Sequence, residues 1–425
     1  MLNQSARAGS PCHVADIVSR LPKRIAILGS TGSIGCNALD VIHHLGAGYQ
    51  VVALSGHQNV ASLLAQAGEH SPKAVAITGS VDESVKNKFR ALGVSVYEGA
   101  EGLIELVERD DIDVVLAAVV GAAGLPAVLA AVCAGKQIAL ANKESLVIAG
   151  SLLIPEARKR GVQIIPVDSE HSAIFQALQC GKKEEIRRVI LTASGGPFRT
   201  MPLNEMHRAT PQDALNHPIW RMGDKITIDS ATMFNKGLEL IEACWLFDLP
   251  PEKIQVVVHP ESVVDSMVEF IDGSVMAQLS PPDMRTPIQY ALTYPERAEG
   301  VSRRMDWSQA WKLSFEPPDL QRFPALKVAY DVATCGGTAG AVLNAANEVA
   351  VEAFTSGKIM FGEICRVVEL TISRHRLTSA PSLDDLLKAD RWARTEAGAI
   401  IEQQQSLLSS TNADQDQGPV RNIAL

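Results

Sequence analysis

Three separated carboxylate residues have the types and positions needed to hold one divalent cation. Asp168 and Glu170 follow an apolar run in IIPVDSEHSAIFQAL, and Glu239 lies in IDSATMFNKGLELIEACWLF. On an extended backbone, residues i and i+2 point to the same side, so Asp168 and Glu170 could bind one hard cation through oxygen. Alternatively, Asp168 or Ser169 only caps the helix that follows. Glu239 as a third carboxylate would complete a site with positions left open for a substrate.

Two lysines accompany these carboxylates. Asn235 and Lys236 precede Glu239 by four and three residues, so on a helix all three side chains share one face. A surface ion pair between Lys236 and Glu239 is the alternative. Lys143, in ALANKESLV, directly follows an uncharged run, and the ends of such parallel strands present ligands in doubly wound sheets. We therefore predict a functional rather than a solvated Lys143.

A small turn rich in hydrogen-bond donors could hold a phosphate. Ser194, Gly195 and Gly196 follow the apolar run VILTA, and their backbone N–H groups could wrap an anion. A plain β-turn before Pro197 is the competing interpretation. Further hydroxyl, amide and cationic donors for the same anion would come from Ser230, Asn235, Lys236 and His217.

The run RIAILGSTGSIGCNALDVI predicts a strand, a glycine-rich turn and a helix. Gly29, Gly32 and Gly35 would let the backbone pass close to a pyrophosphate at the helix N-terminus. The spacing is GxxGxxG rather than GxGxxG, but the flanking strand and helix favour dinucleotide binding over a turn without ligand. Backbone N–H groups and hydroxyls would come from Thr31, Ser33 and Ile34.

The end of the next strand, VVALSGHQN, indicates which dinucleotide would bind. An NAD-binding protein usually places Asp or Glu here, roughly twenty residues further on, for the ribose 2′-hydroxyl. The residues at this point are instead Ser55, Gly56, His57, Gln58 and Asn59. Without a carboxylate the pocket should tolerate a 2′-phosphate, which favours NADPH over NADH. The alternative is that these are ordinary loop residues.

The elements that position these residues predict an α/β protein of several domains. Before about residue 165, short apolar runs alternate with longer amphipathic stretches, as in βαβ units with a parallel sheet. The runs RRVILTA, KITID, IQVVVH and SVMAQLS then suggest strands mixed with helices. We predict a Rossmann-like parallel-sheet domain (22–167), a central α+β catalytic and dimerisation domain (168–300), a linker (301–326), a C-terminal helical domain (327–403) and a disordered tail (404–425).

Composition narrows the class of partner. A formal net charge of -9 argues against nucleic acid, which would require a surplus of Lys and Arg. Seven scattered cysteines without a CxxC pair are typical of reduced thiols in a cytosolic protein. Residues 114–135 carry no charge, but Gly121, Gly124 and Pro126 interrupt them, which favours a buried strand, turn and helix over a membrane span. The first residues have no apolar segment typical of a secretory signal.

Together these segments resemble the 1-deoxy-D-xylulose 5-phosphate reductoisomerases. The motifs GSTGSIG, VGAAGL, LANKESLV, PVDSEH, SGGPF, KITIDSATMFNKGLE, VVHPES, PDMRTPI and LNAANE occur in this order between residue 24 and about 395. The resemblance implies NADPH and Mg²⁺ or Mn²⁺ as cofactors and a small sugar phosphate as substrate. It also implies a cytoplasmic homodimer that makes 2-C-methyl-D-erythritol 4-phosphate for isoprenoid synthesis.

The resemblance also implies roles for individual residues. Metal ligands would be Asp168, Glu170 and Glu239, and Lys143 and Ser169 would touch the substrate. The substrate phosphate would be surrounded by Ser194, His217, Ser230, Asn235 and Lys236, and HPIWRMG, with Trp220, would form a mobile lid. Cofactor contacts would come from Gly29, Thr31, Gly32, Ser33, Ile34, Gly56, Asn59, Asn142, Glu144 and Gly223.

Some positions depart from the family pattern, and other functions stay open. Ile219 stands in the lid where Asn or Thr is frequent, and His57 and Gln58 replace small and basic residues. One rival is a simpler NADP-linked dehydrogenase whose carboxylates are structural, and it should be indifferent to chelators. Another is a non-catalytic NADPH-sensing protein that uses its central domain for dimer contacts.

Overall fold

The computed structural model describes residues 21–415, with side chains described as far as residue 406. Its N-terminal part is a seven-stranded sheet in the order β4-β3-β2-β1-β5-β6-β7, with parallel pairing throughout. The strands are β1 (Lys23–Leu28), β2 (Tyr49–Gly56), β3 (Ala74–Ile77), β4 (Ser95–Glu98), β5 (Val114–Ala117), β6 (Gln137–Leu140) and β7 (Ile164–Pro166). The predicted Rossmann-like parallel sheet is confirmed, although the short β4 has no counterpart in the sequence prediction.

Helices connect these strands and bury their side chains. β3 and β5 are buried along their whole length, as expected of parallel strands covered on both faces. The sheet order changes direction between β1 and β5, and ligands of doubly wound sheets bind at such a switch point. The helices of this part are α1 (Ser33–Leu45), α2 (Val60–His70), α3 (Glu83–Ala91), α4 (Gly99–Val107), α5 (Leu125–Cys133) and α6 (Lys143–Arg160).

The central part contains a second, mixed sheet in the order β11-β10-β8-β9. Only β8 and β9 run parallel in it, and β10 pairs antiparallel with both of its neighbours. The strands are β8 (Ile186–Ala193), β9 (Ile254–Val258), β10 (Val264–Phe270) and β11 (Val275–Leu279). The helices are α7 (Ser169–Ala177), α8 (Leu203–Met206), α9 (Pro211–Leu215), α10 (Asp224–Thr232), α11 (Phe234–Phe247) and α12 (Arg285–Thr293).

One predicted strand in this part is wrong. KITID lies within helix α10 rather than in a strand, and β10, which the prediction missed, takes a central place in the sheet. Alternating Ile and Thr favour a strand locally, but tertiary packing overrides such a preference. Here Thr227, Ile228 and Ala231 are buried at helical spacing, and Lys225 pairs with Asp229 one turn away. A helix therefore buries the apolar side chains and also brings Lys225 and Asp229 together as an ion pair.

The C-terminal part is helical. Its helices are α13 (Ala325–Cys335), α14 (Ala339–Thr355), α15 (Glu363–Arg374) and α16 (Leu383–Gln415). α14 is buried along most of its length and supplies side chains to the apolar cores of both the N-terminal and the central parts. Between α12 and α13 the chain is irregular apart from a single bridge between Val258 and Glu316.

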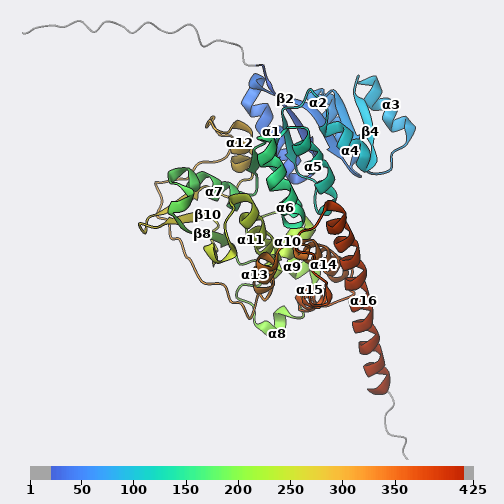
Figure 1. The fold of residues 1–425 in the computed structure, drawn as a ribbon, viewed down its shortest axis with the longest axis vertical. Coiled ribbons are helices and arrows are strands. Elements are labelled where there is room, and N and C mark those ends of the chain that lie inside the picture. The colour runs from blue at the N-terminus through green and yellow to red at the C-terminus, as the bar shows by residue number, and fades with distance from the viewer. Residues whose placement is uncertain (1–20, 416–425) are drawn as a thin grey trace, which may run out of the picture.

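The predicted disordered tail is wrong over part of its length. α16 continues as far as Gln415, and Figure 1 shows it extending beyond the rest of the fold. Between Gly398 and Gly418 the sequence has neither Gly nor Pro to stop a helix, so its polar composition alone was a poor guide. Residues 416–425 lie outside the described residues, as do residues 1–20. Within residues 21–415, no helix combines the length and apolarity that crossing a membrane requires.

Candidate active site

Three carboxylates from two helices converge at one point. Asp168 is the N-cap residue of α7 and Glu170 lies in its first turn, while Glu239 sits inside α11. One oxygen from each lies within 4.8 Å of the others. The extended backbone expected for Asp168 and Glu170 is therefore wrong. The first helical turn brings them together instead, and the Asp168 side chain makes no capping hydrogen bond.

Lys143 lies among these carboxylates at the N-terminus of α6. Its Nζ is 2.5 Å from Asp168 Oδ2 and 3.1 Å from Glu239 Oε1. It also donates a hydrogen bond of 2.8 Å to Asn235 Oδ1. The side chain is 8% exposed, so Lys143 is a buried counter-charge rather than a solvated lysine.

Lys236 makes the matching contacts on the other side. Its Nζ donates to Glu170 Oε1 at 2.8 Å and pairs with Glu239 Oε2. Ser169 donates to Glu170 Oε2 at 2.6 Å. The alternative of a surface ion pair between Lys236 and Glu239 is wrong, because the two side chains are only 4% and 0% exposed.

Burial and charge give these acids very different affinities for protons. Burial raises the pKa of Glu239 to about 7, and the neighbouring charge of Glu170 adds to the increase. Burial also opposes ionisation of Asp168, but Lys143 and His171 lower its pKa to about 2. Asp265, on β10, has its pKa raised to about 8 by burial and by Glu170. The site thus concentrates negative charge that two lysines only partly compensate.

The donor set suits a hard divalent cation. Asp168, Glu170 and Glu239 offer only oxygen, which is the ligand type that Mg²⁺ and Mn²⁺ prefer. Because their oxygens already lie within 4.8 Å of one another, a single ion can reach all three with little rearrangement. Lys143 and Lys236 then hold the carboxylates in place when no cation compensates them.

The predicted phosphate-binding residues form a second group. Gly195 and Gly196 have φ values of 84° and 66°, a left-handed conformation that favours glycine. A Cβ on Gly196 would lie 2.7 Å from the carbonyl oxygen of Ser230, so this turn packs directly against α10. The side chains of Ser194 and His217 lie 3.0 Å apart. In contrast, Asn235 and Lys236 lie with the carboxylates.

His217 also organises the segment predicted as a lid. Its Nδ1 accepts hydrogen bonds from the backbone N–H groups of Ile219 and Trp220, at 3.2 and 2.9 Å. In the neutral ring the proton is therefore on Nε2, which faces Ser194. Burial lowers the pKa of His217, which favours this neutral form. Ile219 thus contributes its backbone where the family often has a polar side chain.

The predicted dinucleotide turn lies at the switch point of the sheet. Gly32 is the N-cap residue of α1, so Ser33 and Ile34 begin that helix and their backbone N–H groups lie at its positive end. Gly29 has a φ of 80°, and a Cβ there would lie 2.6 Å from the carbonyl oxygen of Ala118, which follows β5. Close approach of the two strand ends therefore requires glycine at Gly29.

The other predicted cofactor residues differ in whether their side chains already have hydrogen-bond partners within the protein. Gly56 ends β2, but the side chain of Asn59 caps α2 by accepting from the Ser62 N–H at 3.2 Å. Asn142 is buried and donates to Glu144 Oε2 at 2.8 Å and to the Gly121 carbonyl at 3.0 Å. Gly223 is the N-cap residue of α10. Asn59 and Asn142 therefore have structural partners of their own.

Comparison with known proteins decides the family. Residues 25–150 match the family model of 1-deoxy-D-xylulose 5-phosphate reductoisomerase. Residues 164–247 match the C-terminal domain of the same enzyme, and residues 279–396 match the DXP reductoisomerase C-terminal domain. A 1-deoxy-D-xylulose 5-phosphate reductoisomerase of Prosthecochloris aestuarii is 50% identical over 89% of this chain and 99% of its own. This chain belongs to the 1-deoxy-D-xylulose 5-phosphate reductoisomerase family.

Solved structures of reductoisomerases have the same fold. The Zymomonas mobilis enzyme in complex with NADPH is 46% identical with a TM-score of 0.84, over 90% of this chain and 99% of its own. A reductoisomerase in complex with NADPH, fosmidomycin and magnesium is 44% identical with a TM-score of 0.84, over 89% and 98% of the two chains.

The sequence analysis did not identify three polar residues beside the candidate site. His171 and Glu242 lie behind the carboxylates and are 0% and 1% exposed, and Asp265 lies close enough to be influenced by Glu170. His171 and Glu242 each follow a predicted ligand, Asp168 and Glu239, by three residues. That shared helical offset is the signal that could have found them.

Proposed function

We propose that this chain catalyses the NADPH-dependent isomerisation and reduction of 1-deoxy-D-xylulose 5-phosphate to 2-C-methyl-D-erythritol 4-phosphate, with Mg²⁺ or Mn²⁺. The observation that carries the proposal is the convergence of Asp168, Glu170 and Glu239 within 4.8 Å. The neighbouring sheet supplies a dinucleotide turn at its switch point. The names of the relatives and the complexes of related enzymes with NADPH and magnesium support the same reaction.

The side chains divide the work between binding and charge compensation. When bound, the divalent ion supplies Lewis acidity to the rearranging carbon skeleton and NADPH supplies the hydride. Lys143 and Lys236 hold the carboxylates in register and limit their repulsion. Ser169 lies beside Glu170 and can reach a substrate hydroxyl.

The phosphate would be held at the other end of the substrate. The phosphate would lie against the turn at Gly195 and Gly196, where Ser194 and His217 supply a hydroxyl and an imidazole N–H. The Gly196 N–H already donates to the Ser194 hydroxyl at 3.2 Å and so holds that side chain in place. Ser230 lies against the same turn. Trp220, whose backbone N–H donates to His217 Nδ1, would then fold over the substrate and exclude water from the reacting atoms.

The cofactor would lie along the carboxyl edge of the parallel sheet. The N-terminus of α1, with Gly32 as its N-cap, would receive the pyrophosphate. The end of β2 carries no carboxylate to repel a 2′-phosphate, which supports NADPH. Further contacts in the proposal come from Thr31, Ser33, Ile34, Gly29, Gly56, Asn59, Asn142, Glu144 and Gly223.

The same proposal includes a cytoplasmic homodimer. β11 is an edge strand of the central sheet, and its Val275, Met276 and Leu279 are 46%, 38% and 37% exposed. An exposed apolar edge is a template for pairing with another chain, and a second copy would cover it. Light scattering should then give twice the mass of one chain, and Met276→Lys should shift the protein towards the monomer. An equivalent Leu92→Lys change, on an exposed site of the N-terminal part, should leave the dimer intact.

One assay separates this function from its rivals. Following NADPH absorbance with 1-deoxy-D-xylulose 5-phosphate should show oxidation that EDTA abolishes and added Mg²⁺ or Mn²⁺ restores. A simpler NADP-linked dehydrogenase would be indifferent to EDTA, and a sensor would bind NADPH without oxidising it. Either result would overturn the proposed function.

A further inference from the structure

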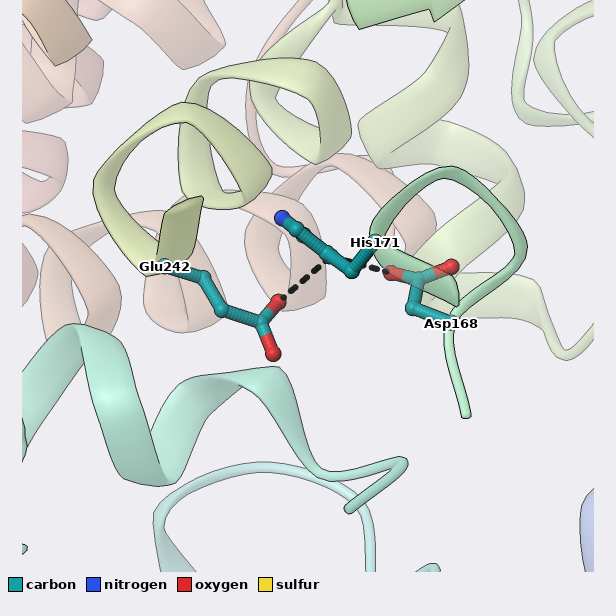
Figure 2. A group of neighbouring side chains, drawn as sticks. All are labelled: Asp168, His171 and Glu242. Atoms are coloured by element: carbon teal, nitrogen blue, oxygen red, sulfur yellow. Dashed lines mark ion pairs between the residues drawn. The ribbon is translucent and has the colours of Figure 1, made fainter. Parts of the chain in front are cut away.

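A buried imidazole joins the two helices that carry the three carboxylates. His171, in α7, lies with its Nε2 2.9 Å from the backbone carbonyl oxygen of Glu239, in α11. Its Nδ1 lies 3.2 Å from Glu242 Oε2 and 3.9 Å from Asp168 Oδ2. Figure 2 shows the ring between these two carboxylates. His171 therefore connects α7, to which it belongs, with α11 at the point where the acidic residues of the two helices meet.

The contacts fix how this ring is oriented. A carbonyl oxygen can only accept, so Nε2 carries a proton and the ring cannot flip without losing the bond to Glu239. Glu242 follows Glu239 by three residues and so lies on the same side of α11. It faces Nδ1 from α11, and Phe247 packs near the ring with centroids 6.2 Å apart.

Glu242 has an unusual environment for a carboxylate. It is 1% exposed, and within residues 21–406 neither of its oxygens has a hydrogen-bond partner. Its Oε2 lies 3.2 Å from His171 Nδ1, which likewise has no hydrogen-bond partner among these residues, and the two form an ion pair when the ring is protonated. Burying a carboxylate with so few partners costs stability, so an apolar residue here would favour folding. A destabilising residue of this kind beside a candidate site is the pattern expected when it serves function rather than stability.

We propose that His171 and Glu242 are positioning residues that set the separation of the metal-binding carboxylates. The inference rests on the proposed function, because it assumes that Asp168, Glu170 and Glu239 hold the ion. His171 connects the first turn of α7, with Asp168 and Glu170, to the backbone at Glu239. Glu242, 3.2 Å from Nδ1, would favour the ring orientation that makes this connection through its negative charge. Neither residue itself needs to bind the ion.

Mn²⁺ affinity tests this without relying on turnover. The signal of free Mn²⁺ in electron paramagnetic resonance gives the Kd of the full-length protein, and quenching of tryptophan fluorescence gives the Kd for NADPH. Glu242→Gln should weaken Mn²⁺ binding about 10–100-fold, the usual effect of losing a residue that orients metal ligands. NADPH binding should stay unchanged, which also shows that the variant is folded.

A matched variant controls for the change in charge. Glu252 is exposed and follows α11, so Glu252→Gln removes the same charge without touching the site. Its Mn²⁺ affinity should equal that of the wild type. If Glu242→Gln does not fold, Glu242→Asp keeps the charge but shortens the side chain, and it should weaken Mn²⁺ binding less severely.

Two substitutions of the imidazole separate its contacts. His171→Gln can place an amide donor near the position of Nε2 and keep the bond to the Glu239 carbonyl, whereas His171→Asn reaches only the position of Nδ1. Mn²⁺ affinity should therefore fall in the order wild type, His171→Gln, His171→Asn. Wild-type Mn²⁺ affinity in Glu242→Gln and in both His171 variants would overturn the positioning role. Asp168→Asn distinguishes a failure of the positioning role from a failure of the proposed function, because wild-type Mn²⁺ affinity in that variant would refute the metal site itself.

Discussion

Lys143 and Asp168 form an ion pair of 2.5 Å between side chains that are 8% and 15% exposed. Lys143 begins α6 of the N-terminal part, and Asp168 is the N-cap residue of α7 of the central part. The ammonium group thus joins the end of the parallel sheet to the proposed metal site. It also compensates two carboxylates that would otherwise repel each other, because Glu239 lies within 3.1 Å of it.

Lys143→Gln should make stability depend strongly on the metal. Without Mg²⁺ the variant leaves Asp168 and Glu239 without this counter-charge, and breaking such a buried pair costs about 3–5 kcal/mol. Mg²⁺ should then raise the Tm of the variant more than that of the wild type. Thermal unfolding with and without Mg²⁺ measures this. Lys183→Gln, which removes an exposed pair with Asp248, should show a wild-type response. An equal rise for all three proteins contradicts the expectation.

Asp168→Asn should stop turnover while leaving the cofactor site intact. The amide keeps the size of the side chain but removes the charge that a divalent cation needs, so we expect kcat to fall at least about 100-fold. The Kd for NADPH should change little, since Asp168 lies outside the dinucleotide turn. Steady-state rates measure the fall in kcat, and fluorescence titration with NADPH measures the Kd for the cofactor. Full activity in this variant would refute the assignment.

Gly196→Ala should weaken substrate binding through its phosphate end. The new Cβ would meet the carbonyl oxygen of Ser230 at 2.7 Å and would also strain a residue whose φ is 66°. We expect KM to rise about tenfold or more, in line with a cost of about 1–3 kcal/mol for such a conformation. Gly273→Ala is the control, because its φ is 86° but nothing lies near the added Cβ. A similar KM increase in both variants would show that backbone strain, not the site, is responsible.

Asp265→Asn should alter how stability depends on pH. Burial and Glu170 raise the pKa of Asp265 to about 8, above the value of about 3.9 expected in the unfolded chain. Between these values the folded state binds the extra proton, so the contribution of Asp265 to stability is greatest below the unfolded pKa and decreases as pH rises towards 8. The asparagine variant lacks this titration. Its free energy of unfolding should therefore rise relative to that of the wild type, by roughly 1 kcal/mol per pH unit between pH 6 and 8.

Chemical denaturation in EDTA at pH 6 and pH 8 measures the difference. Asp272→Asn is a suitable control, since hydrogen bonds from Ser274 lower the pKa of this exposed residue and it stays ionised throughout that range. The difference between Asp272→Asn and the wild type should be the same at both pH values. A constant difference for Asp265→Asn as well would show that Asp265 does not hold a proton in the folded state.

Local patterns predicted much of the fold. The apolar runs of β1, β2, β3, β5 and β6, and the glycine turn before α1, follow from strand burial and backbone freedom, which are encoded in adjacent residues. The shared helix face of Asn235, Lys236 and Glu239 also followed from spacing alone. KITID was predicted wrongly because its β-branched residues are buried by contacts distant in sequence.

The assembly of the site could not be derived from local patterns. Asp168 and Glu239 lie on different helices, and their proximity depends on how α7 and α11 pack, for which the motif resemblance supplied the only guide. The offset of three residues from Asp168 to His171 and from Glu239 to Glu242 indicates a shared helix face, but it does not predict the contact between the two helices that brings His171 and Glu242 together. The domain bounds stay a prediction.

The two hydrogen bonds that His217 accepts have a consequence for the order of events in a catalytic cycle. An anion that draws the Nε2 proton towards Ser194 also makes Nδ1 a better acceptor for Ile219 and Trp220. Arrival of the substrate's charged end would thus tighten the backbone of the segment that is predicted to close over it. Substrate entry and lid closure would then be one cooperative event, transmitted through the imidazole ring of His217.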